Sequence, residues 1–226
     1  MGTRFISAGA LAANDTTATL AITAPSANIG DVFVAFILAK DNQAITRPSN
    51  WFDVETTNNG AAMRTSTFWH GVVAGDSGAG FNFTKPVDNN LLFCGLICCY
   101  RGVDLTTIFG GSTTISVNAS ADNVTYASFT STREGLCVAA GYYANDLTTP
   151  GAVSGTNPTF TLRAQPETSL GSDASIFVSD GYILRGVTTG GRTQASNSTA
   201  DAINNGVLFN LVSHKQKALT ILGVGR

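Results

Sequence analysis

Short apolar runs, each closed by turn-forming residues, recur along almost the whole of this chain. Residues 16–23 alternate polar and apolar side chains, which is typical of a strand with one buried face. Val32–Ala39 is apolar at every position, as expected for a strand that is covered on both faces. Residues 58–60, Asn-Asn-Gly, join two further runs, and these residue types tolerate the positive φ angles of a hairpin turn.

Almost no segment has the spacing of an amphipathic helix. The chain is therefore predicted to be all-β with very little helix, folded as an antiparallel two-sheet β-sandwich. Residues 1–226 are predicted to form a single domain, because no linker or change of composition divides them. Besides 16–23 and 32–39, strands are predicted at 51–57, 62–73, 81–84, 91–100, 125–130, 136–143, 159–163, 175–184, 206–212 and 219–224.

One short internal echo is visible in the sequence. Residues 101–103 and 185–187 both read Arg-Gly-Val, and each triplet is followed by Thr-Thr and Gly-Gly. Both triplets come just after a predicted buried strand. The echo has three readings: chance, two equivalent turns, or an internal duplication.

Charge is scarce in this chain. Charged residues make up 12% of it, against about 25% in an average soluble domain. A surface rich in Thr, Ser, Asn and Gly suits a β protein that lies against other proteins. The net charge of −2 and the absence of a basic stripe disfavour a nucleic-acid partner. The longest apolar runs, 32–39 and 91–100, are far shorter than the roughly 20 residues that span a membrane, and no secretory signal follows Met1.

The four cysteines lie in the two most apolar predicted strands. Cys94 and Cys98 share one strand face with Leu92 and Leu96, whereas Cys99 points to the other face. The sulfurs therefore cannot converge on one zinc ion. We expect free, buried thiols, which fit assembly in a reducing cytoplasm. The alternative is a disulfide of Cys137 with Cys94 or Cys98.

One segment resembles a catalytic motif. Residues 75–78, Gly-Asp-Ser-Gly, match the nucleophile loop of trypsin-like proteases, but Ser77 lacks the upstream His and Asp that such enzymes need. The favoured reading is a hairpin turn, and a serine hydrolase acting through Ser77 is a remote alternative. His70 and His214 have no partners at metal-ligand spacing. We therefore predict no catalytic, cofactor-binding or metal-binding residues.

Four segments in order resemble a recurring module of tailed-phage virion proteins. They are GDVFVAFILA (30–39), RPSNWFDVET (47–56), FWHGVVAGDSGAGFNFT (68–84) and LLFCGLICCYRGVD (91–104). The resemblance covers about residues 15–104 and implies a jelly-roll-like β-sandwich, as in capsid decoration proteins and tail or fibre proteins. It brings no catalytic residues with it.

The resemblance also implies structural roles for its motif residues. Trp51 would be a core anchor, and Arg101 would pair with Asp104 to fix a turn. Asn50 stands where the module usually has Gly, and Asn can adopt the same left-handed conformation. The remaining motif positions are turn glycines: Gly30, Gly75 and Gly102.

The sequence therefore favours a non-enzymatic structural protein of a tailed-phage virion, most of all a capsid decoration (cement) subunit. Expected partners are the major capsid protein, other virion proteins, or a second copy of the chain, and its place is the virion, assembled in the host cytoplasm. The alternative is a tail or fibre component that contacts host surface glycans. A sugar-stacking platform would draw on the chain's aromatic side chains, namely Trp51, Trp69, Tyr126, Tyr142 and Tyr143.

Two segments are candidate docking sites on other virion proteins. Residues 213–217 form a polar, basic tip between two apolar runs, and residues 3–5 precede the first of the patterned segments. Rim charges of this kind act mainly on association rate and salt dependence. The candidate interface residues are Thr3, Arg4, Phe5, His214, Lys215 and Lys217.

Overall fold

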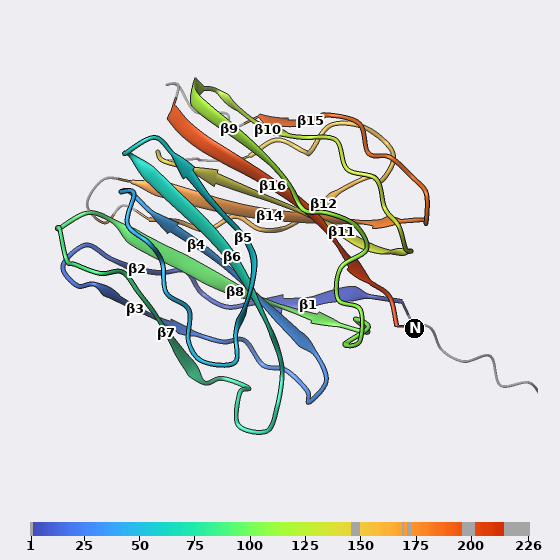
Figure 1. Cartoon of the computed structure of the whole chain (residues 1–226), viewed down its shortest axis with the longest axis horizontal. Coiled ribbons are helices and arrows are strands. Elements are labelled where there is room, and N and C mark those ends of the chain that lie inside the picture. Colours follow the sequence, from blue (N-terminus) through green and yellow to red (C-terminus); the bar gives the residue numbers. More distant parts are fainter. Residues whose placement is uncertain (1, 146–149, 169, 171–172, 196–201, 215–226) are drawn as a thin grey trace, which may run out of the picture.

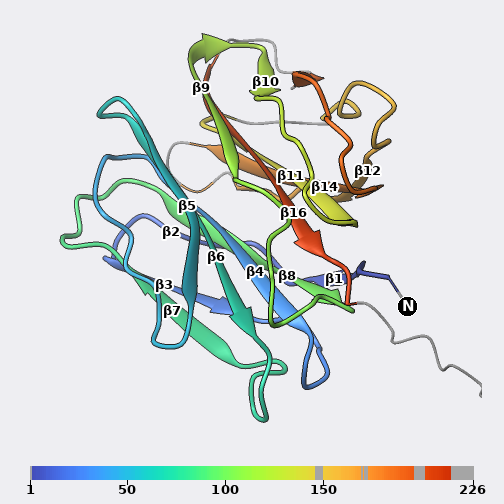
Figure 2. The ribbon, with the colours of Figure 1, turned by 45° about the vertical axis from the view of Figure 1, so that its right-hand side comes forward.

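The computed structural model describes residues 2–145, 150–168, 170, 173–195 and 202–214. These residues contain strands and turns but no helix, so no described segment forms a helix able to cross a membrane. The strands form four antiparallel sheets, two large and two small, stacked in layers (Figures 1 and 2). The predicted all-β sandwich class is confirmed, as two sandwich-like pairs of sheets.

Each large sheet is paired with a small sheet on its outer face. The first large sheet has the order β1 (Arg4–Ala8), β8 (Phe93–Arg101), β4 (Val32–Ala39), β6 (Met63–Gly71) and β5 (Phe52–Asn59), with β2 (Ala12–Asn14) also on β8. Its small partner is β3 (Thr19–Thr23) with β7 (Gly80–Thr84). The second large sheet has the order β12 (Thr161–Ala164), β14 (Ala174–Ile183), β11 (Gly135–Tyr143), β16 (Ala202–Val212) and β9 (Thr114–Ala121), with β13 (Glu167–Thr168) also on β14. Its small partner is β10 (Asn123–Tyr126) with β15 (Arg192–Ala195).

This layering explains why the central strands are apolar on both faces. In β4, Val34 and Phe36 point into the core between the two large sheets. Phe33 and Ile37 point the other way, into a second core under β3 and β7. A third core lies between the second large sheet and its small partner. Folding therefore removes the side chains on both faces of β4, β8 and β11 from water. Burial of apolar side chains is the main driving force for a fold of this kind.

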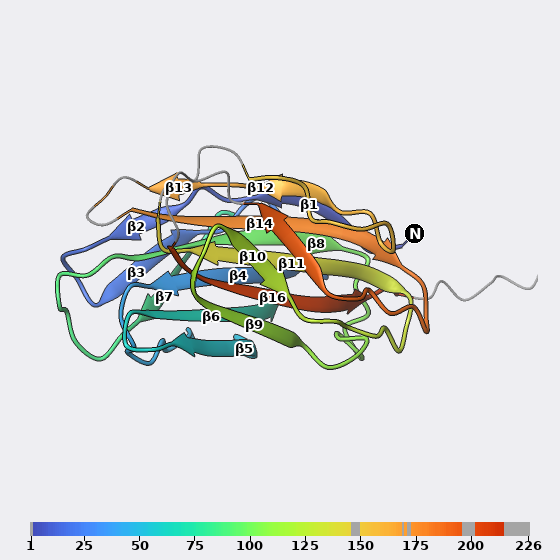
Figure 3. The same cartoon turned by 90° about the horizontal axis from the view of Figure 1, so that it is seen from above.

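The two halves of the chain have the same topology. If β1, β3, β4, β5, β6, β7 and β8 are matched in chain order to β9, β10, β11, β12, β14, β15 and β16, the large-sheet order and the small-sheet pairing both coincide. The halves touch at their edges through β1 with β12 and β5 with β9, as Figure 3 shows. These two contacts are equivalent under the match, which is the property of an approximately twofold interface.

The Arg-Gly-Val echo is not a trace of this repeat. Residues 101–103 begin at the last residue of β8, whereas residues 185–187 follow β14. The counterpart of β14 in the first half is β6, so the two triplets occupy non-equivalent places. The strand topology therefore repeats between the two halves, but the two Arg-Gly-Val triplets do not mark equivalent positions in it.

Several predicted turns take the expected backbone conformation. Gly60 has φ 60° in the hairpin between β5 and β6, and Asn50 has φ 66°, so Asn does replace Gly in a left-handed position. Gly30, Gly75 and Gly102 also have positive φ. Predicted strand 219–224 lies outside the described residues.

One end of the molecule collects most of the segments discussed below. We call it the terminal end, because β1 begins there and β16 ends there (Figure 1, at the label N). The strand pairings place the starts of β4 and β11 and the ends of β6, β8 and β14 at the same end. Its surface is formed by residues 24–31, 72–79, 102–106, 127–134, 184–191 and 213–214.

Candidate functional site

Thr3 ties the N-terminal segment to the rest of the terminal end. Its backbone N–H donates to Ser213 Oγ at 3.0 Å, and its hydroxyl donates to the carbonyls of Gly102 at 3.0 Å and Val212 at 3.2 Å. The residue is buried. Its contacts are therefore made within the chain, and they hold the beginning of β1 beside the end of β16.

Phe5 is likewise engaged inside the molecule. Its ring packs edge-on against Tyr100 with centroids 5.8 Å apart, and the Arg163 guanidinium lies 5.6 Å from its centroid. Arg4 and His214 are exposed at the terminal end, and the His214 N–H donates to the Gly102 carbonyl. Lys215 and Lys217 lie outside the described residues. The assignment of these six residues to docking stays a prediction.

The predicted pairing of Arg101 with Asp104 is wrong. Arg101 instead forms a two-armed ion pair with Asp31. Asp104 accepts hydrogen bonds from the Thr106 N–H at 2.9 Å and the Thr106 hydroxyl at 2.6 Å. The aspartate thus fixes its own turn, while the arginine reaches across the sheet to the turn that precedes β4.

Ser77 lies in the hairpin turn between β6 and β7, and its surroundings are those of a turn residue. Its hydroxyl oxygen accepts the Ala27 N–H at 3.0 Å. His70 lies 2.8 Å from the Asn50 carbonyl through Nδ1 and 2.8 Å from Asp76 Oδ2 through Nε2. Both ring nitrogens are therefore occupied, and among the described residues no hydrogen bond joins His70 to Ser77.

All four cysteines are free and buried. Cys94 and Cys98 lie in the core between the large sheets, Cys99 in the core under β3 and β7, and Cys137 in the third core. The alternative of a disulfide from Cys137 to Cys94 or Cys98 is thus wrong. Burial raises the pKa of Cys94 to about 12, so its unreactive thiol form dominates at neutral pH.

In the structure, the five aromatic side chains of the candidate platform do not form one exposed surface. Trp51 is fully buried, and its indole stacks on His70 with centroids 5.3 Å apart, which confirms its role as a core anchor. The tyrosines of the candidate platform are buried too. Trp69 is half-buried and stacks on the exposed Phe52 at 4.8 Å. These contacts use the rings for packing between strands.

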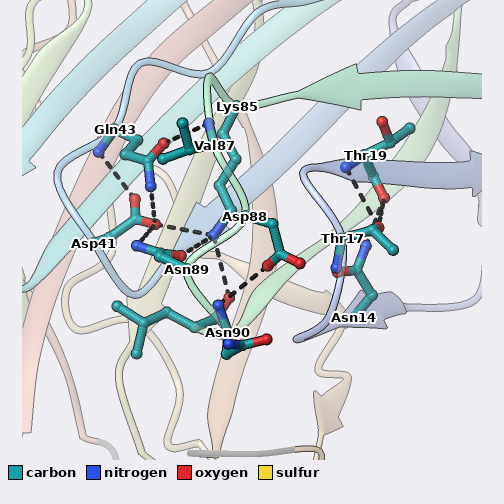
Figure 4. Close-up of polar contacts among 11 residues, drawn as sticks. Asn14, Thr17, Thr19, Asp41, Gln43, Lys85, Val87, Asp88, Asn89 and Asn90 are labelled. Atoms are coloured by element: carbon teal, nitrogen blue, oxygen red, sulfur yellow. Dashed lines mark hydrogen bonds and ion pairs between the residues drawn. The ribbon is translucent and has the colours of Figure 1, made fainter.

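Sequence reasoning missed a buried ion pair between Lys85 and Asp41, which Figure 4 shows. It lies opposite the terminal end, where β4 ends and β8 begins. The Lys85 ammonium donates to Asp41 Oδ2 at 3.0 Å, to Asn89 Oδ1 at 2.6 Å and to the Leu91 carbonyl at 3.3 Å. Burial alone would raise the pKa of Asp41, but hydrogen bonds from the Gln43 N–H, Lys85 and Asn89 lower it from its ordinary value. The network closes the loops between β4 and β5 and between β7 and β8.

The Lys85 ammonium is the cation that these oxygen atoms surround. Nowhere in the described residues do three or more His, Cys, Asp or Glu side chains gather in a way that could hold a metal ion. We call this network the Lys85 clamp. The candidate functional site is the terminal end, where Thr3, Arg4 and His214 lie.

No protein-family model matches this chain, and neither a curated protein nor a solved structure matches it.

Proposed function

We propose that this chain is a non-enzymatic structural protein of a tailed-phage virion, a decoration (cement) subunit that binds the outside of the capsid shell. The observation that carries the proposal is a low-charge surface on a scaffold whose loops are fixed by internal contacts. Charged residues make up 12% of the chain, and several of them, such as Asp31, Arg101, Asp41 and Lys85, are used in ion pairs within it.

The residues by which the chain resembles the virion module support the same proposal. Trp51 is a core side chain, Asp31 and Arg101 join β4 to β8, and Ser77 fixes a turn. A binder that is rigid before it docks loses little conformational entropy on binding. Such a subunit resists shell expansion by bridging neighbouring shell proteins.

A direct test adds the purified protein to shells assembled without it. We expect bound protein after sedimentation and a higher temperature of shell rupture. An unrelated β-sandwich protein at the same concentration is the control and should leave the rupture temperature unchanged. Equal rupture temperatures with and without this protein would contradict the cementing role.

A further inference from the structure

Exposed aliphatic side chains stand on four loops of the terminal end, and at the opposite end Val87 and Leu91 are also exposed. The exposed fractions are 74% for Ile29, 56% for Val73, 48% for Leu105 and 57% for Leu184. Single exposed apolar residues are ordinary on protein surfaces. These four, however, lie on four different loops at one end of the molecule. Val73 and Leu184 follow β6 and β14, which are equivalent strands of the two halves.

Two cavities open at the same end. One, of about 320 Å³, has Gly30, Val103, Leu105 and His214 among its lining residues. It places the predicted docking residue His214 beside an exposed aliphatic side chain. The second cavity, of about 290 Å³, lies in the other half of the chain.

The second cavity is lined by Thr132, Arg133, Glu134 and Arg185. Arg133 comes from the loop between β10 and β11, and Arg185 from the loop between β14 and β15. In the part of the chain that the structure describes, neither guanidinium has a hydrogen bond or ion pair with a protein group. Two arginine side chains at one cavity are suited to bind carboxylates through paired hydrogen bonds.

The carboxylates of the terminal end, in contrast, already have partners within the chain. They are Asp31 with Arg101, Asp76 with His70, Asp104 with Thr106, and Glu134 with Tyr182. Arg133 and Arg185 are therefore the charged side chains on these described loops that have no protein partner, and they remain available to carboxylates of another protein.

Hydrogen bonds fix the loops that carry these side chains. The Ala27 N–H donates to Ser77 Oγ, which joins the loops before β4 and after β6. In the second half, the Ser131 N–H donates to the Val187 carbonyl at 3.0 Å, and the Gly186 N–H donates to the Ser131 carbonyl at 2.7 Å. Equivalent loop pairs are thus tied in both halves, so the surface is largely formed before any partner binds.

We propose that the terminal end is the docking surface, and that its occupant is a protein surface with an apolar patch bordered by carboxylates. The aliphatic tips Ile29, Val73 and Leu105 pack on the patch, and Arg133 and Arg185 bind the carboxylates. Under the proposed function, on which this inference rests, that surface belongs to the capsid shell. The opposite end, with its Lys85 clamp, faces away from the shell.

The test compares three variants in co-sedimentation with shells assembled without this protein. The first reverses charge with Arg133→Glu and Arg185→Glu, and the second removes apolar tips with Ile29→Ser and Val73→Ser. The matched control, Arg64→Glu with Val87→Ser, makes the same kinds of change at the opposite end. All these side chains are on the surface, and circular dichroism melting curves check that each variant folds like the parent.

We expect about tenfold weaker binding for both terminal-end variants and parental binding for the control. The loss from charge reversal should shrink as salt rises, because salt screens exposed charges. If the parent binds and the terminal-end variants bind equally well, the docking inference is wrong while the proposed function stands. If the parent itself does not bind shells, the proposed function fails and the inference with it. A parental dimer that only the terminal-end variants dissociate, seen by light scattering, would assign the surface to a second copy and overturn the inference.

Discussion

Arg101, the last residue of β8, donates from Nε and Nη2 to the two carboxylate oxygens of Asp31, each at 2.8 Å. Asp31 directly precedes β4, the neighbour of β8 in the sheet. The same carboxylate accepts the Asn28 N–H at 2.8 Å. One buried aspartate thus fixes the turn before β4, the end of β8 and one edge of the terminal end.

Replacing Asp31 with Asn should lower the free energy of unfolding at neutral pH. Charged hydrogen bonds of this kind contribute about 1.5–3 kcal/mol, and Asn keeps the size of the side chain but loses its charge. Chemical denaturation of the parent and of Asp31→Asn measures the difference. An unchanged unfolding free energy would show that the ion pair does not stabilise the fold.

The same pair predicts a pH dependence. Burial alone would raise the pKa of Asp31, but the hydrogen bonds from Arg101 and from the Asn28 N–H lower it below its ordinary 3.8. A carboxyl group whose pKa is lowered in the folded state stabilises the protein at pH values above its ordinary pKa. This stabilisation is lost as the pH falls through the folded-state pKa. The difference in the free energy of unfolding between the parent and Asp31→Asn should therefore become smaller as the pH falls below about 4.

The Lys85 clamp provides a third prediction. Lys85→Met should lower the free energy of unfolding by about 3–5 kcal/mol, because it leaves the buried Asp41 carboxylate without its cation. Adding Asp41→Asn should recover most of this loss. Arg47→Ala is the control, since it breaks the exposed pair with Asp53 and should cost less than about 1 kcal/mol. Similar unfolding free energies for Lys85→Met and Arg47→Ala would contradict the clamp.

The layered arrangement of the sheets could be predicted in part from the apolar pattern of single strands. Val32–Ala39 was predicted as a strand covered on both faces, and β4 has these bounds with cores on each side. The predictions missed β1, β2, β9, β13 and β15. Of these, β9, Thr114–Ala121, is an edge strand with few buried side chains. An edge strand is held by backbone pairing with a distant partner, here β16, and its own residues carry little periodic signal.

The candidate site was harder to predict because its parts are far apart in sequence. Arg133 and Arg185 meet only through the pairing of β11 with β14. Arg101 was assigned to the nearby Asp104, but its partner Asp31 lies across the sheet, where β4 pairs with β8. Sequence proximity favoured the wrong aspartate, because no local pattern indicates which strand ends become neighbours.

Close packing in the second half predicts an effect of a single methyl group. A Cβ at Gly141 would overlap the Phe177 ring across the β11–β14 pair. Gly141→Ala should therefore destabilise the protein by about 1–3 kcal/mol through overpacking. Gly80→Ala is the matched control, because nothing lies within 4 Å of its added Cβ. Equal thermal stability of the two variants would contradict this packing.

The four thiols should be unreactive in the native state. All are buried, and burial raises the pKa of Cys94 and Cys99 to about 12. Titration with a thiol reagent at neutral pH should be slow for the folded protein. Unfolding without reductant should release all four groups at once, and release of two or fewer would show a disulfide.

The most direct measurement of the central claim is the location of this protein on purified phage particles. Particles are disrupted gently, heads and tails are separated on a density gradient, and the protein is detected with an antibody in each fraction. The account predicts that the protein remains with DNA-filled heads and is absent from tail fractions. Recovery with tails, or in neither fraction, would contradict a capsid decoration role.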